Sequence, residues 1–536
     1  MERERRYLTG ELSGGLIERL DMVFEEWDSR ASPGCALGIY HEGEILYARG
    51  YGMSNLEHDV PIAPDSVFHV ASISKQFAAH CIVLLAKEGK LSFDDDVRDY
   101  LPELPDYGPT ITIRHLIHHT SGLRDQWELL RLAGWREDDL ITDGDVLEIV
   151  PRQTALNFPP GEQEFYSNTG YTFLGLIVQR VTGQTLRRFA EERIFEPLGM
   201  ARTHFHDDHN EIVPGRTHGY VPGKDEVGFR ISNPVFDTTG ATSLHTTVED
   251  LFRWDQYLER WLQGPENAEY LERAVLNDGE QRKYGCGLRY DTRHGVERVG
   301  HAGADAGYRA HYLRVPAHRL GIAILCNLST MTPANLVDDV LAILLEARFG
   351  GRPDQPPALI DLSREQLAAL TGIYRGLRTG ALQVVELEDG RLRLPSLFNA
   401  ALEPLVDDRF AIEGLPTRVV RFVTADGDEA LRMEIDEIDT FERLSAFDSA
   451  TVEPSEYAGS YYSEELGVDY RLAIEDGELH WTQRRYDPCQ LRAVHENTFV
   501  QGRFWYEFQR DGEGDVSGFT ISSMRARGIR FERLDQ

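Results

Sequence analysis

Residues 67–92 read VFHVASISKQFAAHCIVLLAKEGKLS, an apolar helical run with a serine and a lysine near its start. Ser72 lies three positions before Lys75, so on a helix the two side chains share one face, about one turn apart. Serine is also a preferred first residue of helices, and lysine is common inside them. The pair alone therefore does not distinguish a reactive site from an ordinary helix start.

Lysine is rare in this chain, which makes its positions informative. Lys and Arg together number 56, but only five of them are lysines: Lys75, Lys87, Lys90, Lys224 and Lys283. Arginine carries surface charge equally well but cannot lose its proton near neutral pH, whereas a buried lysine can. Ser72 and Lys75 form the only Ser-x-x-Lys pair in the sequence. A chemical role for the pair is therefore favoured.

The composition is that of an acidic globular protein with several domains. The chain has 536 residues, 41% of them apolar, and a formal net charge of −33 from 89 acidic and 56 basic residues. This length predicts two to four domains. Because phosphate binding depends on lysine and arginine, the charge argues against nucleic acid and anionic membranes as partners.

The sequence predicts a cytoplasmic protein without disulfides. Its first 20 residues are charged and lack the apolar core of a signal peptide, and no apolar run reaches the length of a membrane span. The five cysteines are scattered and form neither a disulfide framework nor a Cys-x-x-Cys metal site. A homodimer is left open, since nothing in the sequence determines the oligomeric state.

The first 349 residues predict an α+β domain, an antiparallel sheet flanked by helices. Strand patterns come early, as a hairpin with its turn at 41–43, and return at 285–291 and 308–327. Between and around them lie helical patterns at 12–30, 72–90, 112–120, 143–152, 169–182, 186–195 and 334–349. Strands at both ends with helices between them indicate one sheet closed by the two ends of the domain.

The remainder of the chain contains an internal repeat. LTGIY at 370–374 resembles YAGSY at 457–461, each copy has an EDG turn sixteen residues later, and both end in FERL, at 441–444 and 531–534. Asp-Gly turns between alternating apolar residues predict hairpins, so each copy should be a small antiparallel barrel. We therefore expect a catalytic domain at 1–349, a Gly/Pro-rich linker at 350–359, and barrels at 360–448 and 449–536.

Two further motifs follow the Ser-x-x-Lys pair in order. Tyr166-Ser167-Asn168 lies in a loop-like stretch, and His301-Ala302-Gly303 lies beside a late strand. Neither motif indicates a function by itself, since Tyr-x-Asn and His-x-Gly occur by chance in most proteins. The order and setting of the three motifs are what carry the inference.

With these motifs the chain resembles the penicillin-recognising serine hydrolases, the group with class C β-lactamases, D-alanyl-D-alanine carboxypeptidases, esterases and D-aminopeptidases. Connecting segments such as ITIRHLIHHTSGL, FEPLGM and GATSLHTTVEDLFRW are similar too, over about residues 15–348. The D-aminopeptidases are the most similar in layout, because they also carry two small barrels after the catalytic domain, and RARGIRFERL resembles their C-terminal sequence. The fold implied is that of β-lactamases and transpeptidases, followed by two barrels.

The resemblance implies a role for each motif residue. Ser72 would be the nucleophile, and Lys75 and Tyr166 would carry its proton, in a division that the sequence leaves open. Asn168 would orient the substrate amide. The backbone N–H groups of Ser72 and Ala304 would form the oxyanion hole, with Gly303 allowing close approach of the backbone. No cofactor and no metal are implied.

His301 occupies the position where many β-lactamases have lysine. A cation that could pair with a substrate carboxylate is thus replaced by a group that is largely neutral at pH 7. This favours action on a small peptide, amide or ester. The prediction is an acyl-enzyme serine hydrolase of the D-aminopeptidase type, cleaving next to an N-terminal D-amino acid. The alternatives are a broad-specificity carboxylic esterase and a weak β-lactam-hydrolysing or penicillin-binding protein.

A competing signal is the segment THFHDDHNE, which contains His204, His206, Asp208 and His209. These residues fit the His-x-His-x-Asp-His pattern of zinc hydrolases. That pattern should follow an apolar strand, but here it follows the loop-like FEPLGMART. A solvated polar loop is therefore the favoured interpretation. His118 and His119 are likewise interpreted without a metal, as helix-end residues near the core of the fold.

The last barrel predicts a difference in specificity. In D-aminopeptidases a long loop of this barrel enters the mouth of the active site. Here two strand-like runs connect through Gln501-Gly502-Arg503 alone, and an extended residue spans only about 3.5 Å. The mouth should therefore be more open, with weaker discrimination against blocked or longer N-termini.

Overall fold

The computed structural model describes residues 6–8, 12–224, 228–351, 359–397, 399–413, 415–424, 431–436, 439–483 and 486–534. The chain forms two compact units. The first consists of residues 1–123, 137–148 and 158–354, and the second of residues 124–136, 149–157 and 355–536. The second unit therefore includes two short segments from the middle of the predicted catalytic domain.

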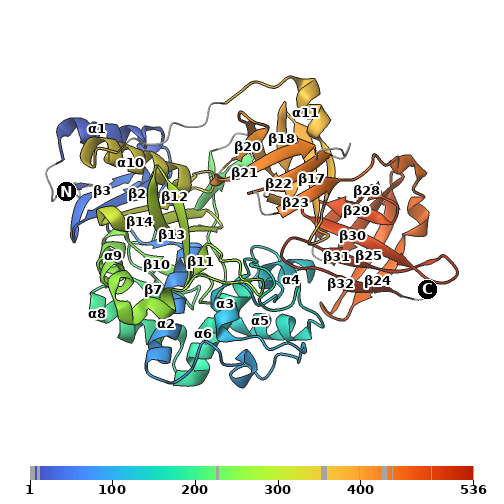
Figure 1. Cartoon of the computed structure of the whole chain (residues 1–536), viewed down its shortest axis with the longest axis horizontal. Helices are drawn as coiled ribbons and strands as arrows, with labels where there is room; N and C mark the ends of the chain where they lie inside the picture. The colour runs from blue at the N-terminus through green and yellow to red at the C-terminus, as the bar shows by residue number, and fades with distance from the viewer. Residues whose placement is uncertain are drawn as a thin grey trace. The chain divides into compact units, whose positions relative to one another are not determined.

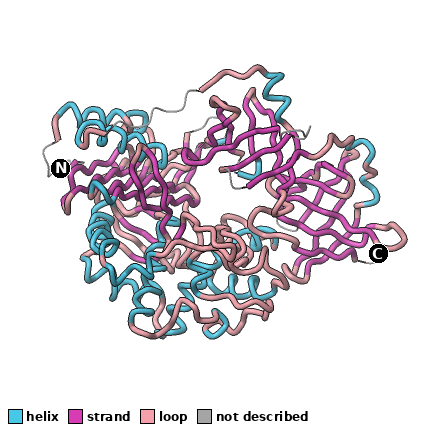
Figure 2. The backbone as a smooth tube through the Cα atoms, in the orientation of Figure 1, coloured by secondary structure: helices cyan, strands magenta, loops and turns pink. Residues whose placement is uncertain are grey.

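An eight-stranded antiparallel sheet organises the first unit (Figures 1 and 2), in the order β1-β3-β2-β15-β14-β13-β12-β11. Strands β2 and β3 form the predicted hairpin, with Glu42 and Gly43 in the left-handed conformation that a tight two-residue turn requires. Strand β2 lies beside β15, so the early and late parts of the unit meet in one sheet, as predicted. The strands are β1 Arg6–Leu8, β2 Cys35–His41, β3 Glu44–Tyr51, β11 Tyr284–Gly285, β12 Leu288–Arg293, β13 Val296–Asp305, β14 Tyr308–Val315 and β15 Leu320–Cys326.

Helices cover both faces of this sheet (Figure 1). On one face α1 (Gly14–Met22) and α10 (Pro333–Arg348) share a hydrophobic core with Leu37 and Ile39 of β2. On the other face Tyr40, the next residue along β2, donates to the carbonyl oxygen of Val248 in α9 (Val248–Gln263). The alternation of side chains along a strand thus assigns neighbouring residues to different layers.

The other helices and strands of the first unit are short, apart from those that carry the motifs. The helices are α2 Ser74–Lys87, α3 Ile113–Ile117, α5 Asp143–Ile149, α6 Asn168–Thr182, α7 Leu186–Ala190 and α8 Glu196–Leu198. A three-stranded sheet has the order β6-β10-β7, with β6 Phe68–His69, β10 Leu244–Thr246 and β7 His204–Phe205. Two small ladders are formed by β4 Met53–Asn55 with β5 Val60–Pro61, and by β8 Tyr220–Pro222 with β9 Phe229–Ile231.

Several elements differ from the sequence-based expectation. The run 308–327 is two strands, because the 3₁₀ turn Pro316–His318 separates β14 from β15. His301 lies within strand β13, which the sequence pattern did not predict as a strand. The helix predicted from residue 72 starts with a 3₁₀ turn, Ala71–Ile73, before α2 begins.

The first repeat of the second unit is a closed antiparallel barrel of eight strands (Figure 1). Helix α11 (Arg364–Leu370) precedes it. The strands are β16 Gly372–Gly376, β17 Leu382–Glu388, β18 Arg391–Leu394, β19 Ala400–Pro404, β20 Arg409–Ile412, β21 Leu415–Thr424, β22 Leu431–Ile435 and β23 Asp439–Arg443.

The second repeat is a nearly closed, nine-stranded antiparallel sheet, in the order β27-β26-β25-β24-β32-β31-β30-β29-β28. Its strands are β24 Gly459–Ser463, β25 Val468–Glu475, β26 Glu478–Gln483, β27 Tyr486–Gln490, β28 Arg492–His495, β29 Thr498–Gln501, β30 Phe504–Arg510, β31 Val516–Ser522 and β32 Ile529–Arg533. The predicted α+β fold with two C-terminal antiparallel barrel-like sheets is confirmed.

The repeat is visible in equivalent contacts as well as in sequence. Tyr374 of β16 pairs with Arg443 of β23, and Tyr461 of β24 pairs with Arg533 of β32. Each tyrosine hydroxyl donates to the carbonyl oxygen four residues earlier, at 2.7 and 2.8 Å. Both Asp-Gly turns have positive φ at both residues, the geometry of a tight hairpin.

The two inserted segments of the second unit pack on the second repeat. Helix α4 (Gln126–Leu132) lies in the first of them. Next to it the Arg124 guanidinium forms a buried ion pair with Glu465 at 2.7 Å. Removing one partner of such a pair leaves an uncompensated buried charge. The predicted linker lies mostly on residues 352–358, outside the described residues, and the predicted domain boundaries remain a prediction.

Candidate active site

Ser72 lies in the 3₁₀ turn that leads into α2, and its side chain is half-buried. Ala71 before it has φ +47°, a left-handed conformation that non-glycine residues rarely adopt and that is frequent at active sites. Ser74 is fully buried and its hydroxyl is bonded twice, to the carbonyl oxygen of Ala71 at 2.5 Å and to the N–H of Leu244 at 2.9 Å. Ser74 therefore has a structural role, and Ser72 is the accessible serine of the motif.

Lys75 is completely buried at the centre of a hydrogen-bond network. Its ammonium group lies 3.0 Å from Ser72 Oγ, 2.9 Å from Asn168 Oδ1 and 2.6 Å from the carbonyl oxygen of Ala241. These partners match the three donors of an ammonium group. If Lys75 loses a proton, Nζ gains a lone pair 3.0 Å from the hydroxyl that it must activate.

Tyr166 and Asn168 reach this centre from the start of α6. Asn168 is the first residue of the helix, and Tyr166 is in the loop immediately before it. The Lys75 ammonium lies 4.9 Å from the centre of the Tyr166 ring and 5.7 Å from the centre of the Tyr171 ring. Aromatic faces attract a cation, so these two rings stabilise the lysine charge in a buried setting.

His119 positions the loop that carries Tyr166. It adopts φ +58°, and its ring packs against the Tyr166 ring at a centroid distance of 4.3 Å. Its Nδ1 accepts from the N–H of Ser167 at 3.2 Å, and its carbonyl oxygen accepts from the N–H of Phe165 at 2.7 Å. The sequence predicted only a helix-end residue here, because nothing local indicates that residues 119 and 166 meet.

His301 is buried in β13, and the centre of its ring lies 6.0 Å from the centre of the Tyr166 ring. Its Nε2 lies 3.2 Å from the hydroxyl of Tyr284, and its Nδ1 lies 2.5 Å from the carbonyl oxygen of Ala302. Burial, with the nearby charge of Lys75, lowers the pKa of His301 to about 3. The imidazole is therefore neutral at pH 7, as the sequence-based interpretation required. Tyr284 is a site residue that the sequence reasoning missed.

Gly303 and Ala304 continue β13 beside the serine turn. A Cβ atom at position 303 would overlap the carbonyl oxygen of Val70, so only glycine allows the strand to approach the serine turn this closely. Ala304 is exposed one residue further along. Of the seven predicted residues, Ser72, Lys75, Tyr166 and Asn168 are brought together directly, and His301 and Gly303 border them on one strand.

Comparison with known proteins assigns a family to this arrangement. The family model described as Beta-lactamase matches residues 21–347. The chain belongs to the beta-lactamase family. The predicted resemblance and the predicted serine-hydrolase class are thereby confirmed, although the individual residue roles remain a prediction.

Relatives extend the likeness beyond that family domain. A D-aminopeptidase of Gluconobacter oxydans is 28% identical over 547 residues, covering 98% of this chain and all of that protein. Among solved structures, an octameric penicillin-binding protein homologue from Pyrococcus abyssi has a TM-score of 0.55 at 24% identity, covering 88% of this chain and 98% of that one. A D-amino acid amidase from Ochrobactrum anthropi has a TM-score of 0.54 at 20% identity, covering 62% and 100%. These two structures support the α+β fold described above.

Proposed function

We propose that this beta-lactamase-family chain is an acyl-enzyme serine hydrolase of the D-aminopeptidase type, with Ser72 as nucleophile. The observation that carries the proposal is the 3.0 Å contact between Ser72 Oγ and the completely buried Lys75 ammonium. A serine hydroxyl is a weak nucleophile, and a neighbouring base is what makes it reactive. The D-aminopeptidase that matches nearly the whole chain supports the choice of substrate.

The proposed reaction has two half-steps. Ser72 Oγ attacks the carbonyl carbon of the scissile amide while its proton passes to Lys75 or Tyr166. The resulting oxyanion accepts hydrogen bonds from the N–H groups of Ser72 and Ala304. The amine then leaves with a proton returned by the same pair, and water hydrolyses the acyl-enzyme by the reverse sequence. Asn168, held by Lys75 at 2.9 Å, orients the amide.

The neutral His301 favours amide substrates over substrates that would place a carboxylate beside this histidine. A lysine there would offer a permanent cation, whereas an imidazole with a pKa of about 3 carries no charge at pH 7. Recognition of a substrate carboxylate, which many β-lactams carry, is weakened accordingly. Peptides and amides, and simple esters with them, remain the preferred substrates.

The second repeat supports a relaxed demand for a free small amine. Strands β29 and β30 connect through Gly502 and Arg503 alone, since Gln501 already pairs with Phe504. The Arg503 guanidinium lies 3.0 Å from a carboxylate oxygen of Glu128 in α4, which engages the turn within the second unit. A turn this short offers no long loop that could narrow the mouth to small free amines.

Some expectations stay at the level of a proposal. No described helix is both long and apolar enough to cross a membrane. We propose a cytoplasmic location, the domain boundaries given above and small-molecule substrates without nucleic acid or membrane partners. A homodimer remains one option for the assembly, and the octameric homologue describes that protein alone.

One paired assay and one variant test the proposal. Hydrolysis of D-alanine p-nitroanilide should exceed that of the L-isomer, and a fluorophosphonate should label wild type but not Ser72→Ala. Ser74→Ala is the matched control, because Ser74 lies on the same turn and should leave labelling intact once folding is verified. Full labelling of Ser72→Ala, or a preference for the L-substrate, would refute the corresponding part of the proposal. The kcat/KM values for acetylated and free D-alanine p-nitroanilide then test the prediction that the mouth of the active site is open. Complete exclusion of the acetylated substrate would show that this prediction is wrong.

A further inference from the structure

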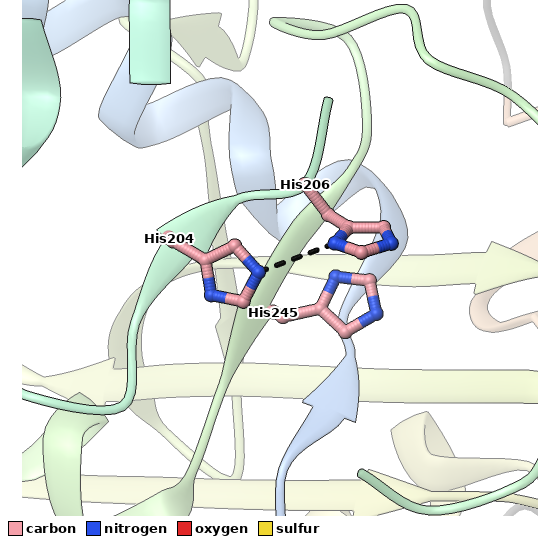
Figure 3. Close-up of side chains that lie close together, drawn as sticks. All are labelled: His204, His206 and His245. Atoms are coloured by element: carbon pink, nitrogen blue, oxygen red, sulfur yellow. Dashed lines mark hydrogen bonds between the residues drawn. The ribbon is translucent and has the colours of Figure 1, made fainter. Parts of the chain in front are cut away.

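Three histidines of the first unit are brought together away from the Ser72 centre. They are His204 of β7, His206 just after it and His245 of β10 (Figure 3). One ring nitrogen from each lies within 4.8 Å of the other two. Residues i and i+2 of a strand point to the same face, so His204 and His206 share a face. His245 is the direct cross-strand partner of His204, which places it in the same group.

We propose that these three histidines bind one divalent transition-metal ion, with Zn²⁺ as the preferred ion. The distance from His204 Nε2 to His206 Nδ1 is 3.3 Å. Two nitrogens at Zn–N distances of 2.0–2.1 Å on a tetrahedron are separated by about 3.4 Å, so this pair already has the required spacing. A hydrogen bond can join only two of the three ring nitrogens through one proton. A metal ion, by contrast, can accept a lone pair from all three.

The burial of the group supports metal binding. His206 and His245 are buried, and His204 is half-buried. In its neutral form, each imidazole keeps one ring nitrogen with a lone pair. Metal binding requires that neutral form of imidazole.

The surroundings provide further partners for a bound ion. Glu211 Oε2 lies 3.7 Å from His206 Nδ1, and Arg187 holds the same carboxylate at 2.6 and 2.8 Å. Such a carboxylate can take the fourth position of a tetrahedral site, and its arginine acts as an outer partner. Among the described residues, nothing is hydrogen-bonded to His206 Nε2. That ring borders a cavity of ≈ 20 Å³, which is room for about one water to act as its outer partner.

This site is different from the zinc pattern in the sequence. Asp208 accepts from the N–H of Asn210, and His209 is hydrogen-bonded to Asp237 at 3.0 Å, so neither belongs to the group. The third ligand, His245, is far away in sequence. None of the three histidines belongs to the Ser72 network, so the ion would have a structural function. It would join β7 to β10, whose Leu244 N–H holds the hydroxyl of Ser74 behind the serine turn.

Metal binding to the full-length chain tests the proposal directly. After dialysis against a chelator and its removal, Zn²⁺ titrated by calorimetry should bind with a stoichiometry of one. His206→Gln and His204→Gln should each weaken Zn²⁺ binding at least about 100-fold, because each removes a ligand. The matched control is His209→Gln, in the same segment but outside the group, which should bind within about threefold of wild type.

Cobalt provides a readout that needs no variant. Co²⁺ in wild type should give the intense visible absorption of a four-coordinate site, and Zn²⁺ should displace it. Labelling of Ser72 by a fluorophosphonate verifies that each variant is folded. Less than one-tenth of an equivalent of Zn²⁺ bound by wild type would overturn the proposal. So would unchanged binding in folded His206→Gln, loss of binding in folded His209→Gln, or only weak six-coordinate Co²⁺ absorption.

Discussion

The Ser72 centre and the His204–His206–His245 group are two buried polar clusters of one unit, built in different ways. Ser72 and Lys75 meet because they are one helical turn apart, so their contact is present in the local sequence. His204 and His245 meet because β7 and β10 pair, across 40 intervening residues of chain. A short-range motif therefore identified the first cluster, whereas the His-x-His-x-Asp-His pattern contains only two of the three histidines of the second, His204 and His206.

The largest expected effect is a loss of catalytic activity when the Ser72 centre is changed and the histidine group is not. Lys75→Met removes the base and the hydrogen bonds of its ammonium group, and should lower kcat/KM by at least about 10⁴-fold. Zn²⁺ binding should be unchanged if the variant is folded. Lys87→Met, on the same helix but bonded to Asn267, is the control that should retain activity. Steady-state kinetics with D-alanine p-nitroanilide decide, and turnover by Lys75→Met near the wild-type rate would contradict the assigned base.

A smaller loss is expected when the second proton carrier is removed. Tyr166→Phe keeps the ring that faces Lys75 and should lower kcat about 10²- to 10³-fold, with a changed pH profile. Tyr171→Phe is the matched control, because its hydroxyl is bonded to the carbonyl oxygen of Ile117 instead. If both variants lose the same amount, the effect comes from packing and not from proton transfer.

Acid should destabilise the first unit through histidines buried in their neutral form. Burial lowers the pKa to about 3 for His80 and His301 and to about 4 for His118 and His311. Below pH 6.5 the unfolded chain binds these protons and the folded unit does not, so the free energy of unfolding falls as the pH decreases from about 6.5 to 4. Each histidine contributes up to about 1.4 kcal/mol per pH unit.

Urea unfolding at several pH values measures this slope. His311→Gln removes one such group and should reduce the slope by about one proton. A free energy of unfolding that is constant between pH 6.5 and 4 would show that these imidazoles are not buried as neutral groups.

The smallest expected effect is on turnover after metal removal. Chelation should leave kcat/KM within about twofold, because no residue of the histidine group belongs to the Ser72 network. The melting temperature of the zinc-loaded chain should fall by a few degrees on chelation, since a ligand that binds only the folded state stabilises it. Loss of turnover that Zn²⁺ restores would mean that the two clusters are not separate in function.

The inserted segments of the second unit show a related limit of sequence reasoning. Arg124 and Glu465 are 341 residues apart, and their buried pair joins a stretch of the predicted catalytic domain to the second repeat. The sequence indicated neither α4 as a helix nor its partner. By contrast, both Asp-Gly turns and the paired FERL ends were predicted and are found at equivalent places, because turn chemistry acts over two residues.

The sequence by itself determined the features that depend on near neighbours: the Ser72–Lys75 spacing, the early hairpin, the repeated barrel units and the neutral residue at position 301. Only the tertiary structure decided which distant residues share a site. It placed His119 and Tyr284 around Tyr166, and it brought His245 next to His204 and His206. The physical reason is that strand pairing and helix packing set these distances, and no periodicity along the chain records which strands will pair.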